Sequence, residues 1–235
     1  MFGDLLKQVV DFHENVVRNI KGIRVTQSLF DDISEDPLDQ AVAIAAENAT
    51  LIPSFSPLIT RPFDYGTVIT YPFVPHNWQA TRFSDGLEYG VWYGSLEIET
   101  TVYESVYHWH RFVMDSFPKE NRTIRGERRI FRVNCGSILI DLRGKERNYP
   151  KLIGRLDYTF TQQLGRYLNQ QNQNGLITKS ARHSGFNTAV FKAQALSNPR
   201  DVCYLTYFMN PTVDEVMVER KPKKRWLSVT PSELA

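Results

Sequence analysis

The run GVWYG, residues 90–94, passes directly into a long segment with helical periodicity. Aromatic and β-branched residues favour strands, so this run predicts a buried β-strand. Ser95 is a favoured helix N-cap residue, and Glu97 and Glu99 suit the first helical turn because their charges complement the helix macrodipole. We therefore predict a helix from Ser95 to about Met114, entered directly from a strand.

This helix has an apolar and a polar face. The apolar stripe consists of Val102, Val106, Trp109 and Val113. The opposite side carries Glu97, Thr100, Thr101, Glu104, His108 and Arg111. Periodicity alone indicates that Glu104 is a solvated acid with His108 and Arg111 as its helical neighbours. His108 and His110 are two residues apart and point to different faces, which argues against a metal site.

The rest of the chain predicts an α+β domain. Strands are predicted at RRIFRVN, SILIDL, VCYLTYFMN, EVMVER and RWLSV, and a short helix at TFTQQLGRYLNQQ. Pro- and aromatic-rich runs between residues 53 and 75, LITRPFDYG and TVITYPFV, predict extended segments separated by turns. Because these elements are interspersed without a regular βαβ rhythm, we expect a mixed α+β architecture.

The first fifty residues predict a helical arm. Five apolar residues recur at helical spacing in the first segment: Leu5, Val9, Phe12, Val16 and Ile20. They predict an amphipathic helix that packs on the body of the protein or on a second copy, which favours a homodimer. A second helix is expected after Ser34, with Pro37 in its first turn. We therefore divide the chain into an N-terminal helical arm, residues 1–52, and a domain over residues 53–235.

Length and charge exclude several classes of protein. At 235 residues the chain suits one domain with an appended arm, and a net charge of +2 is too small for a phosphate-backbone binding surface. The apolar runs are too short for a membrane span, and the amphipathic start does not resemble a secretion signal, so we expect a cytoplasmic protein. Cys135 and Cys203 lie in separate strand-like runs and are expected to be free, buried thiols. Dinucleotide-fold, Walker and nucleophile-elbow motifs are absent from the sequence.

One block of sequence around the predicted strand–helix junction resembles the RES-domain family. In TRFSDGLEYGVWYGSLEIETTVYE, an Arg in a Gly-rich segment is followed by a strand ending in Tyr and then by a helix carrying Glu. Arg82, Tyr93 and Glu104 occupy those three positions. The family's usual Gly-Gly-Arg-Trp-Asn is here Ala-Thr-Arg-Phe-Ser, residues 80–84, which marks a divergent member.

A second block, YTFTQQLGRYLNQQNQNGLITKSARHSGFNTAVFKAQAL, is similar to the same family's Thr-Gln-x-x-Gly helix, Ser-x-Arg strand and Gly-x-Asn strand. The matching positions are Thr161, Gln162 or Gln163, Gly165, Ser180, Arg182, Gly185, Asn187 and Phe191. The family's Tyr-Pro-Ser-Ser-Arg is here Thr-Lys-Ser-Ala-Arg, residues 178–182. The two blocks and an upstream Arg extend the resemblance from Arg61 to about Phe191.

The resemblance implies a fold similar to the ADP-ribosyltransferases, with a split-sheet core that binds NAD⁺ in the cleft between two small sheets. Members of the family are toxins of toxin–antitoxin pairs that deplete NAD⁺ by hydrolysis or phosphorolysis, or that transfer ADP-ribose to a protein. For this chain it implies an NAD⁺-binding catalytic domain over residues 53–235, NAD⁺ as substrate rather than cofactor, and an antitoxin that occludes the cleft. No metal ion is expected, because nicotinamide leaves as a neutral molecule.

The chemistry of that reaction gives each matching residue an expected role. Glu104 is the candidate for stabilising an oxocarbenium-like ribose. Arg82, and second to it Arg61, suit the pyrophosphate because a guanidinium forms paired hydrogen bonds to phosphate oxygens. Tyr93 offers an aromatic face to the nicotinamide ring.

Three further residues complete the expected site. Ser180 is expected to bind the ribose or to orient Glu104, and it is counted with Glu104 and Arg82 as catalytic. Arg182 and Asn187 complete the expected substrate-binding set, with Asn187 as a structural hydrogen-bonding residue beneath the site. Three alternatives stay open: ADP-ribosylation of a protein target, a catalytically degenerate RES-fold binding module, and RNA binding through the basic tail KPKKRW.

Overall fold

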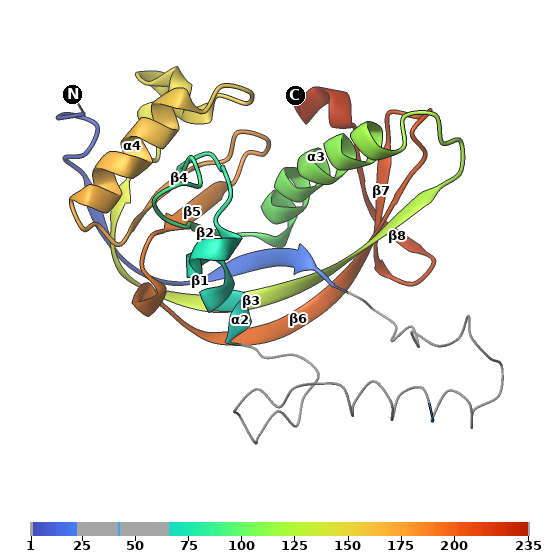
Figure 1. Ribbon diagram of the computed structural model, residues 1–235, viewed down its shortest axis with the longest axis horizontal. Helices are drawn as coiled ribbons and strands as arrows, with labels where there is room; N and C mark the ends of the chain where they lie inside the picture. Colours follow the sequence, from blue (N-terminus) through green and yellow to red (C-terminus); the bar gives the residue numbers. More distant parts are fainter. Residues whose placement is uncertain (1, 23–41, 43–65, 235) are drawn as a thin grey trace.

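The computed structural model of the protein describes residues 2–22, 42 and 66–234, and within them it is a mixed α+β fold (Figure 1). The strands are β1 (Val9–Lys21), β2 (Trp92–Ser95), β3 (Ile124–Asp141), β4 (Gly175–Lys179), β5 (Phe186–Val190), β6 (Leu196–Met209), β7 (Val216–Lys221) and β8 (Lys224–Val229). The α-helices are α2 (Thr67–Thr70), α3 (Ile98–Ser116) and α4 (Thr159–Gln170). The expected α+β class is therefore confirmed.

All eight strands join one sheet, in the order β1-β2-β5-β4-β3-β6-β7-β8. Strand β3 is its centre: β1 pairs antiparallel with it from Lys21↔Arg128 to Val9↔Ile140, and β6 pairs antiparallel with it as well. At its far end β3 pairs in parallel with β4. Because β1 also pairs with β2 at Val17↔Ser95, the strands β1, β2, β5, β4 and β3 form a closed ring of pairings.

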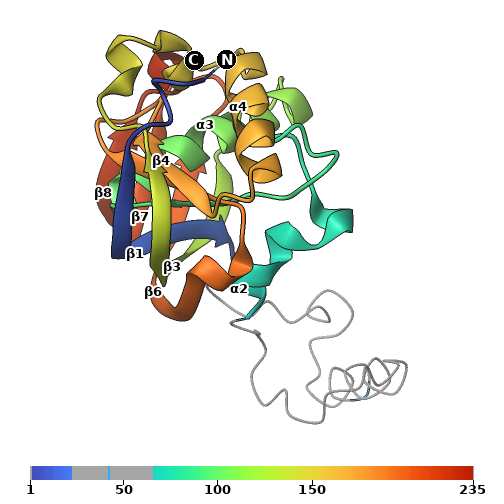
Figure 2. The same cartoon turned by 90° about the vertical axis from the view of Figure 1, so that its left-hand side faces the viewer.

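The two long helices lie on the same side of the long, curved strands β1, β3 and β6, as Figures 1 and 2 show. Helix α3 packs its apolar stripe against β3 and the β6–β8 strands, and all four residues of the predicted stripe are buried. Helix α4 packs against β4 and β5 through Leu164 and Leu168, in a second cluster that also contains Phe2 and Leu5. The first cluster therefore fixes α3 on β3 and β6–β8, and the second fixes α4 on β4 and β5.

The helix predicted for the first twenty residues is wrong, because residues 9–21 form strand β1. The apolar spacing fits a helix, but β3 offers a long strand edge, and pairing along that whole edge overrides the local pattern. Phe12 and Val16 then point into the core as residues of the same strand face. The expected homodimer was based on this helix and loses that support. The second helix after Ser34 and the boundary at residues 52 and 53 lie outside the described residues.

Two smaller predictions are corrected. TVITYPFV is not extended: Thr67–Thr70 is helix α2, and 3₁₀ turns follow at Tyr71–Phe73 and Pro75–Asn77, where proline suits the first turn. The other run of that region, LITRPFDYG, lies almost wholly outside the described residues. Ser95 does not cap α3, because it belongs to β2 and Glu97 takes the cap position.

The other predicted elements are present. RRIFRVN and SILIDL are parts of the single strand β3, and the predicted strands GVWYG, VCYLTYFMN, EVMVER and RWLSV correspond to β2, β6, β7 and β8. The predicted helix at TFTQQLGRYLNQQ is α4. Both cysteines are free, but Cys203 is only half-buried whereas Cys135 is buried. Among the helices of the described ranges, none combines the length and apolar character needed to cross a membrane.

Candidate functional site

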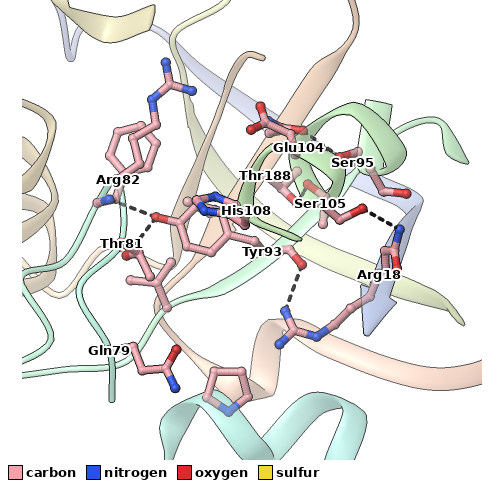
Figure 3. Close-up of a pocket in the computed structure, with 18 of the residues that line it drawn as sticks. Arg18, Gln79, Thr81, Arg82, Tyr93, Ser95, Glu104, Ser105, His108 and Thr188 are labelled. Atoms are coloured by element: carbon pink, nitrogen blue, oxygen red, sulfur yellow. Dashed lines mark hydrogen bonds between the residues drawn. The ribbon is translucent and has the colours of Figure 1, made fainter. Parts of the chain in front are cut away.

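A cavity of about 530 Å³ opens between β2, the N-terminal half of α3, β5 and the segment before β2 (Figure 3). Five of the residues predicted from the sequence line it: Arg82, Tyr93, Glu104, Arg182 and Asn187. Ser180 is buried behind them and contacts Glu104 directly. Six of the seven predicted site residues are thus brought together, and the seventh, Arg61, lies outside the described residues.

The strand pairing explains how these distant residues meet. Asn187 on β5 pairs with Ser95 on β2 and with Thr178 on β4. Ser95 also donates a hydrogen bond from its hydroxyl to Asn187 Oδ1 at 2.6 Å. Because β2 leads into α3 and β4 leads into the turn at Ser180, this pairing carries Glu104 and Ser180 to the same place.

The Glu104 carboxylate is held by three side chains. Oε1 accepts hydrogen bonds from the Ser180 hydroxyl at 2.5 Å and from Asn187 Nδ2 at 2.9 Å. Oε2 accepts one from Arg182 Nη1 at 3.0 Å. The side chain keeps 21% of its surface exposed, so part of the carboxylate faces the pocket.

These contacts set the charge of Glu104. Burial alone raises the pKa of a carboxyl, but the positive charge of Arg182 and the hydrogen bond from Ser180 lower it, as do Arg82 and Asn187. The result is a pKa below the usual value for a glutamate. Glu104 is therefore a fixed anion at neutral pH, and the interpretation from periodicity of a solvated acid is wrong.

Arg182 is the buried counter-ion of Glu104. Its side chain is 2% exposed, and Nη2 donates to the Arg155 carbonyl and to the Tyr158 hydroxyl, each at 3.0 Å. The guanidinium carbon lies 3.7 Å from the centroid of the Tyr107 ring, which is a cation–π distance. Burial lowers its pKa, but the charge of Glu104 and the bond to Tyr158 raise it above the usual arginine value. Arg182 is thus largely committed to protein contacts.

The Ser180 side chain holds both the Glu104 carboxylate and the turn that follows β4. Its hydroxyl oxygen accepts hydrogen bonds from the backbone N–H groups of Arg182 and His183, both at 3.1 Å. The same hydroxyl therefore has its proton directed at Glu104. A Cβ at Gly185 would lie 2.2 Å from the Thr100 hydroxyl, so the turn can approach α3 this closely only with glycine at that position.

Tyr93 presents its ring to the pocket while its hydroxyl is used by the protein. The hydroxyl accepts from the Phe83 backbone N–H at 2.8 Å and donates to Thr81 Oγ1 at 3.1 Å. Burial raises its pKa, so Tyr93 stays neutral. Tyr93 therefore fixes the segment that carries Arg82, and the two dashed lines at its hydroxyl in Figure 3 mark these bonds.

Helix α4 fixes the same segment from its other side. Gln162 Nε2 donates to the Thr81 carbonyl at 2.9 Å and to the Ser84 carbonyl at 3.3 Å. A Cβ at Gly165 would lie 2.0 Å from the Phe83 carbonyl oxygen, so close packing here requires glycine. These contacts assign a structural role to the Gln-x-x-Gly motif, with Gln162 rather than Gln163 as its glutamine.

Arg82 lies at the side of the pocket and is 8% exposed. Its Nη2 donates to the Leu152 carbonyl, and its buried Nε has no hydrogen-bond partner. Burial lowers its pKa, an effect that the nearby negative charge of Glu104 opposes. The guanidinium is therefore near the Glu104 carboxylate but is partly occupied by a backbone contact.

Two pocket residues were not recognised in the sequence as part of a site. His108 lies one helical turn after Glu104, and burial together with the charge of Arg182 lowers its pKa. Arg18 comes from β1 and was missed because its segment was interpreted as a helix. With strand periodicity, Arg18 shares a face with the buried residues Phe12 and Val16, although the exposed Glu14 lies on the same face. The described residues contain no group of three or more His, Cys, Asp or Glu side chains that could hold a metal ion.

Comparison with known proteins identifies a family and a similar solved structure. Residues 57–210, more than half of the chain, match the model of a protein family described as RES domain. A comparison with curated proteins finds no match. Among solved structures, a chain in the crystal structure of the M. tuberculosis MbcT–MbcA toxin–antitoxin complex is similar, with 10% sequence identity and a TM-score of 0.46. That similarity covers 87% of this chain and 88% of the other.

Proposed function

This chain belongs to the RES-domain family, and from that premise we propose that it is a toxin-type enzyme that binds NAD⁺ and cleaves its nicotinamide–ribose bond. The observation that carries the proposal is the Glu104 carboxylate, which is ionised, fixed by three donors and partly exposed to a cavity. A rigid anion in a sheltered pocket suits a reaction in which positive charge develops on the substrate.

In the proposed reaction, the bond between ribose C1′ and the nicotinamide nitrogen breaks with its electron pair moving to that nitrogen. The pyridinium thereby becomes neutral nicotinamide, and positive charge develops on the ribose ring. Glu104 stabilises this charge, and Ser180, Asn187 and Arg182 hold its carboxylate so that little reorganisation is needed. An acceptor then bonds to C1′ and loses a proton to solvent. Water gives ADP-ribose, phosphate gives a phosphorylated ADP-ribose, and a protein nucleophile gives an ADP-ribosylated protein.

The remaining predicted residues have proposed roles in binding. The face of Tyr93 receives the nicotinamide ring, since a cationic aromatic ring stacks well on a phenol. Arg82 contributes positive charge for the pyrophosphate, a role supported by its place in the pocket lining. Asn187 acts indirectly, because its amide is used to hold Glu104 and accept from Ser95.

The ADP-ribosyltransferase-like arrangement is part of the proposal. The short strands β2, β4 and β5 form one group, and the long strands β1, β3 and β6 form another. Pocket residues come from both groups of strands, which supports a ligand bound between them. We further propose a protein antitoxin that covers the pocket, an expectation that comes from the family resemblance.

A non-catalytic RES-fold binding module is the second candidate. The contact between Arg82 and the Leu152 carbonyl favours it, because a guanidinium committed to the backbone has fewer donors left for phosphate. The third candidate, RNA binding through the KPKKRW run, rests on a short basic hairpin between β7 and β8 that lies apart from the pocket.

One experiment separates the proposed enzyme from the binding module. Purified protein is incubated with NAD⁺, with and without inorganic phosphate, while nicotinamide release and the ribose-containing product are measured. Nicotinamide release supports the proposed enzyme, and the product identifies water, phosphate or protein as the acceptor. Binding of NAD⁺ without nicotinamide release would favour the binding module, and the absence of both would overturn the proposal.

A further inference from the structure

His108 is a pocket residue that the proposed mechanism does not use. It belongs to α3, one helical turn after Glu104, and both side chains line the pocket shown in Figure 3. Within the described residues no hydrogen bond engages its ring nitrogens. The residue is also exposed, so its ring can reach both the pocket and bulk solvent. The ring nitrogens of His108 are therefore available to a ligand or to water.

The surroundings of His108 keep its imidazole neutral. Four charged side chains act on the ring: Arg182, Glu104, Arg111 and Arg128. Desolvation in the pocket has the largest effect and lowers the pKa of His108 below the usual 6.5. The three arginines lower this pKa further, and the Glu104 carboxylate opposes them. At neutral pH the ring is therefore a base with one free lone pair.

Among the ionisable residues of the described pocket lining, His108 alone offers a free base at neutral pH. Apart from Glu104, the others are arginines, which keep their protons, and tyrosines, whose neutral hydroxyls are weak bases. The Glu104 carboxylate is engaged by three donors, and its pKa lies below the usual value. A carboxylate stabilised in this way accepts a proton poorly, which leaves His108 for that task.

The helical turn that carries His108 is held in place from two sides. Asn19 Nδ2 on β1 donates to the Ser105 hydroxyl at 3.0 Å, and the Tyr207 hydroxyl on β6 lies 2.8 Å from the same group. The His108 ring packs edge-on against the buried Tyr107 ring, with 5.2 Å between the two centroids. His108 therefore has a defined position relative to the carboxylate on the preceding turn.

We propose that His108 is the general base that takes a proton from water as the water attacks the ribose, so that this chain hydrolyses the dinucleotide. This inference rests on the proposed function for the identity of the substrate. The water donates a hydrogen bond to the imidazole, which leaves a lone pair for C1′. As the C1′–O bond forms and the C1′–N bond breaks, one proton moves to His108. The exposed ring then releases this proton to solvent.

Helical spacing and acceptor chemistry both support this role. Side chains four residues apart on a helix are about 5–6 Å apart at Cβ. One water in contact with both C1′ and His108 needs a similar span, since a hydrogen bond is about 2.6–3.2 Å long and an attack distance about 3–3.5 Å. Phosphate, by contrast, is already an anion at neutral pH and attacks without a base. A base at this place therefore favours water as the acceptor.

The test compares an acceptor that needs a base with one that does not. Full-length protein is incubated with NAD⁺ in phosphate-free buffer containing azide, an anionic nucleophile, and the ratio of ADP-ribose to ADP-ribosyl azide is measured. His108→Ala is expected to lower this ratio by roughly 10²-fold, a usual contribution of a general base. His110→Ala is the matched control, because His110 lies on the same helix away from the pocket lining, and its ratio stays at the parental value. Thermal unfolding of each variant and nicotinamide release are measured in parallel.

The possible results distinguish this inference from the proposed function. A merely structural His108 would leave the ratio unchanged in a folded His108→Ala protein, which would overturn the base role while nicotinamide release still supports the enzyme. If phosphate in place of azide diverts most of the parental product to phosphorylated ADP-ribose, water is not the acceptor and the inference is wrong. The absence of nicotinamide release from the parental protein would contradict both proposals. If His108→Ala does not fold, His108→Gln replaces it, and a lowered or unchanged ratio has the same meaning.

Discussion

The Ser180 hydroxyl donates to Glu104 Oε1 at 2.5 Å across a separation of 76 residues in sequence. Its proton cannot serve another acceptor at the same time, and its lone pairs already receive two backbone N–H groups. Ser180 is therefore best described as a positioning residue for Glu104. This relationship selects between the two roles expected of Ser180, because a hydroxyl saturated in this way has little capacity left for the ribose.

Substitution of Ser180 by Ala should move the pH dependence of the reaction. The hydrogen bond from Ser180 favours the ionised form of Glu104, so its loss raises the pKa of that carboxyl. The acid limb of the rate of nicotinamide release should shift to higher pH by about one unit, the equivalent of one such bond. Ser197→Ala, at an exposed position on β6, is the control. An unshifted acid limb in Ser180→Ala would show that Ser180 does not act through Glu104.

Glu104→Gln should abolish NAD⁺ cleavage and also lower stability. Loss of the carboxylate charge is expected to cost on the order of 10²–10³ in rate. Arg182, 2% exposed, would lose its counter-ion, so the melting temperature should fall as well. Rates are therefore compared at a temperature where both proteins are fully folded, as checked by circular dichroism. Release of nicotinamide at the parental rate would remove Glu104 from the mechanism.

Acid should weaken the Glu104–Arg182 pair. The pKa of Glu104 is lower in the folded protein than its usual value of 4.5, so the pair contributes stability above pH 4.5. This contribution is lost as pH falls through the lower pKa of the folded state. The difference in melting temperature between the parental protein and Glu104→Gln should therefore shrink on acidification from about pH 7 to pH 3. A difference that stays constant over this range would contradict the assigned direction of the pKa shift.

Arg82→Lys should impair NAD⁺ turnover nearly as much as Arg82→Ala. Lysine keeps the charge, but it cannot hold the Leu152 carbonyl and a phosphate through separate arms of one planar group. Steady-state nicotinamide release by both variants, with thermal unfolding as the check on folding, gives the comparison. Near-normal turnover by Arg82→Lys would contradict a role for Arg82 at the pyrophosphate.

Much of the site was predictable because its residues lie in short motifs that can be recognised from the neighbouring sequence alone. Glu104 and Tyr93 sit at the strand–helix junction, where period and capping signals are clear, and the α3 stripe behaves as predicted. Strand β1 was not predictable in this way, since its apolar residues also satisfy a helical period. Residues 9–21 form a strand because they pair with the edge of β3, more than a hundred residues away. Because the local sequence does not reveal this pairing, Arg18 could not be predicted as a pocket residue. Arg182 was recognised by motif, but its commitment to Glu104 became visible only in three dimensions.

The strand order also determines when the proposed site comes into existence during synthesis. Strand β1 is made early, yet its partner β3 begins at Ile124, and the residues that hold Glu104 lie at positions 180, 182 and 187. Pairings this distant in sequence form slowly, because chain entropy is lost before the contacts are gained. A ribosome-bound chain that has exposed β1, β2 and α3 would still have a mobile Glu104 without its three donors. The protein would therefore acquire its proposed activity only after residues 180–187 have left the ribosome, which leaves an interval in which a partner can meet the chain before it is active.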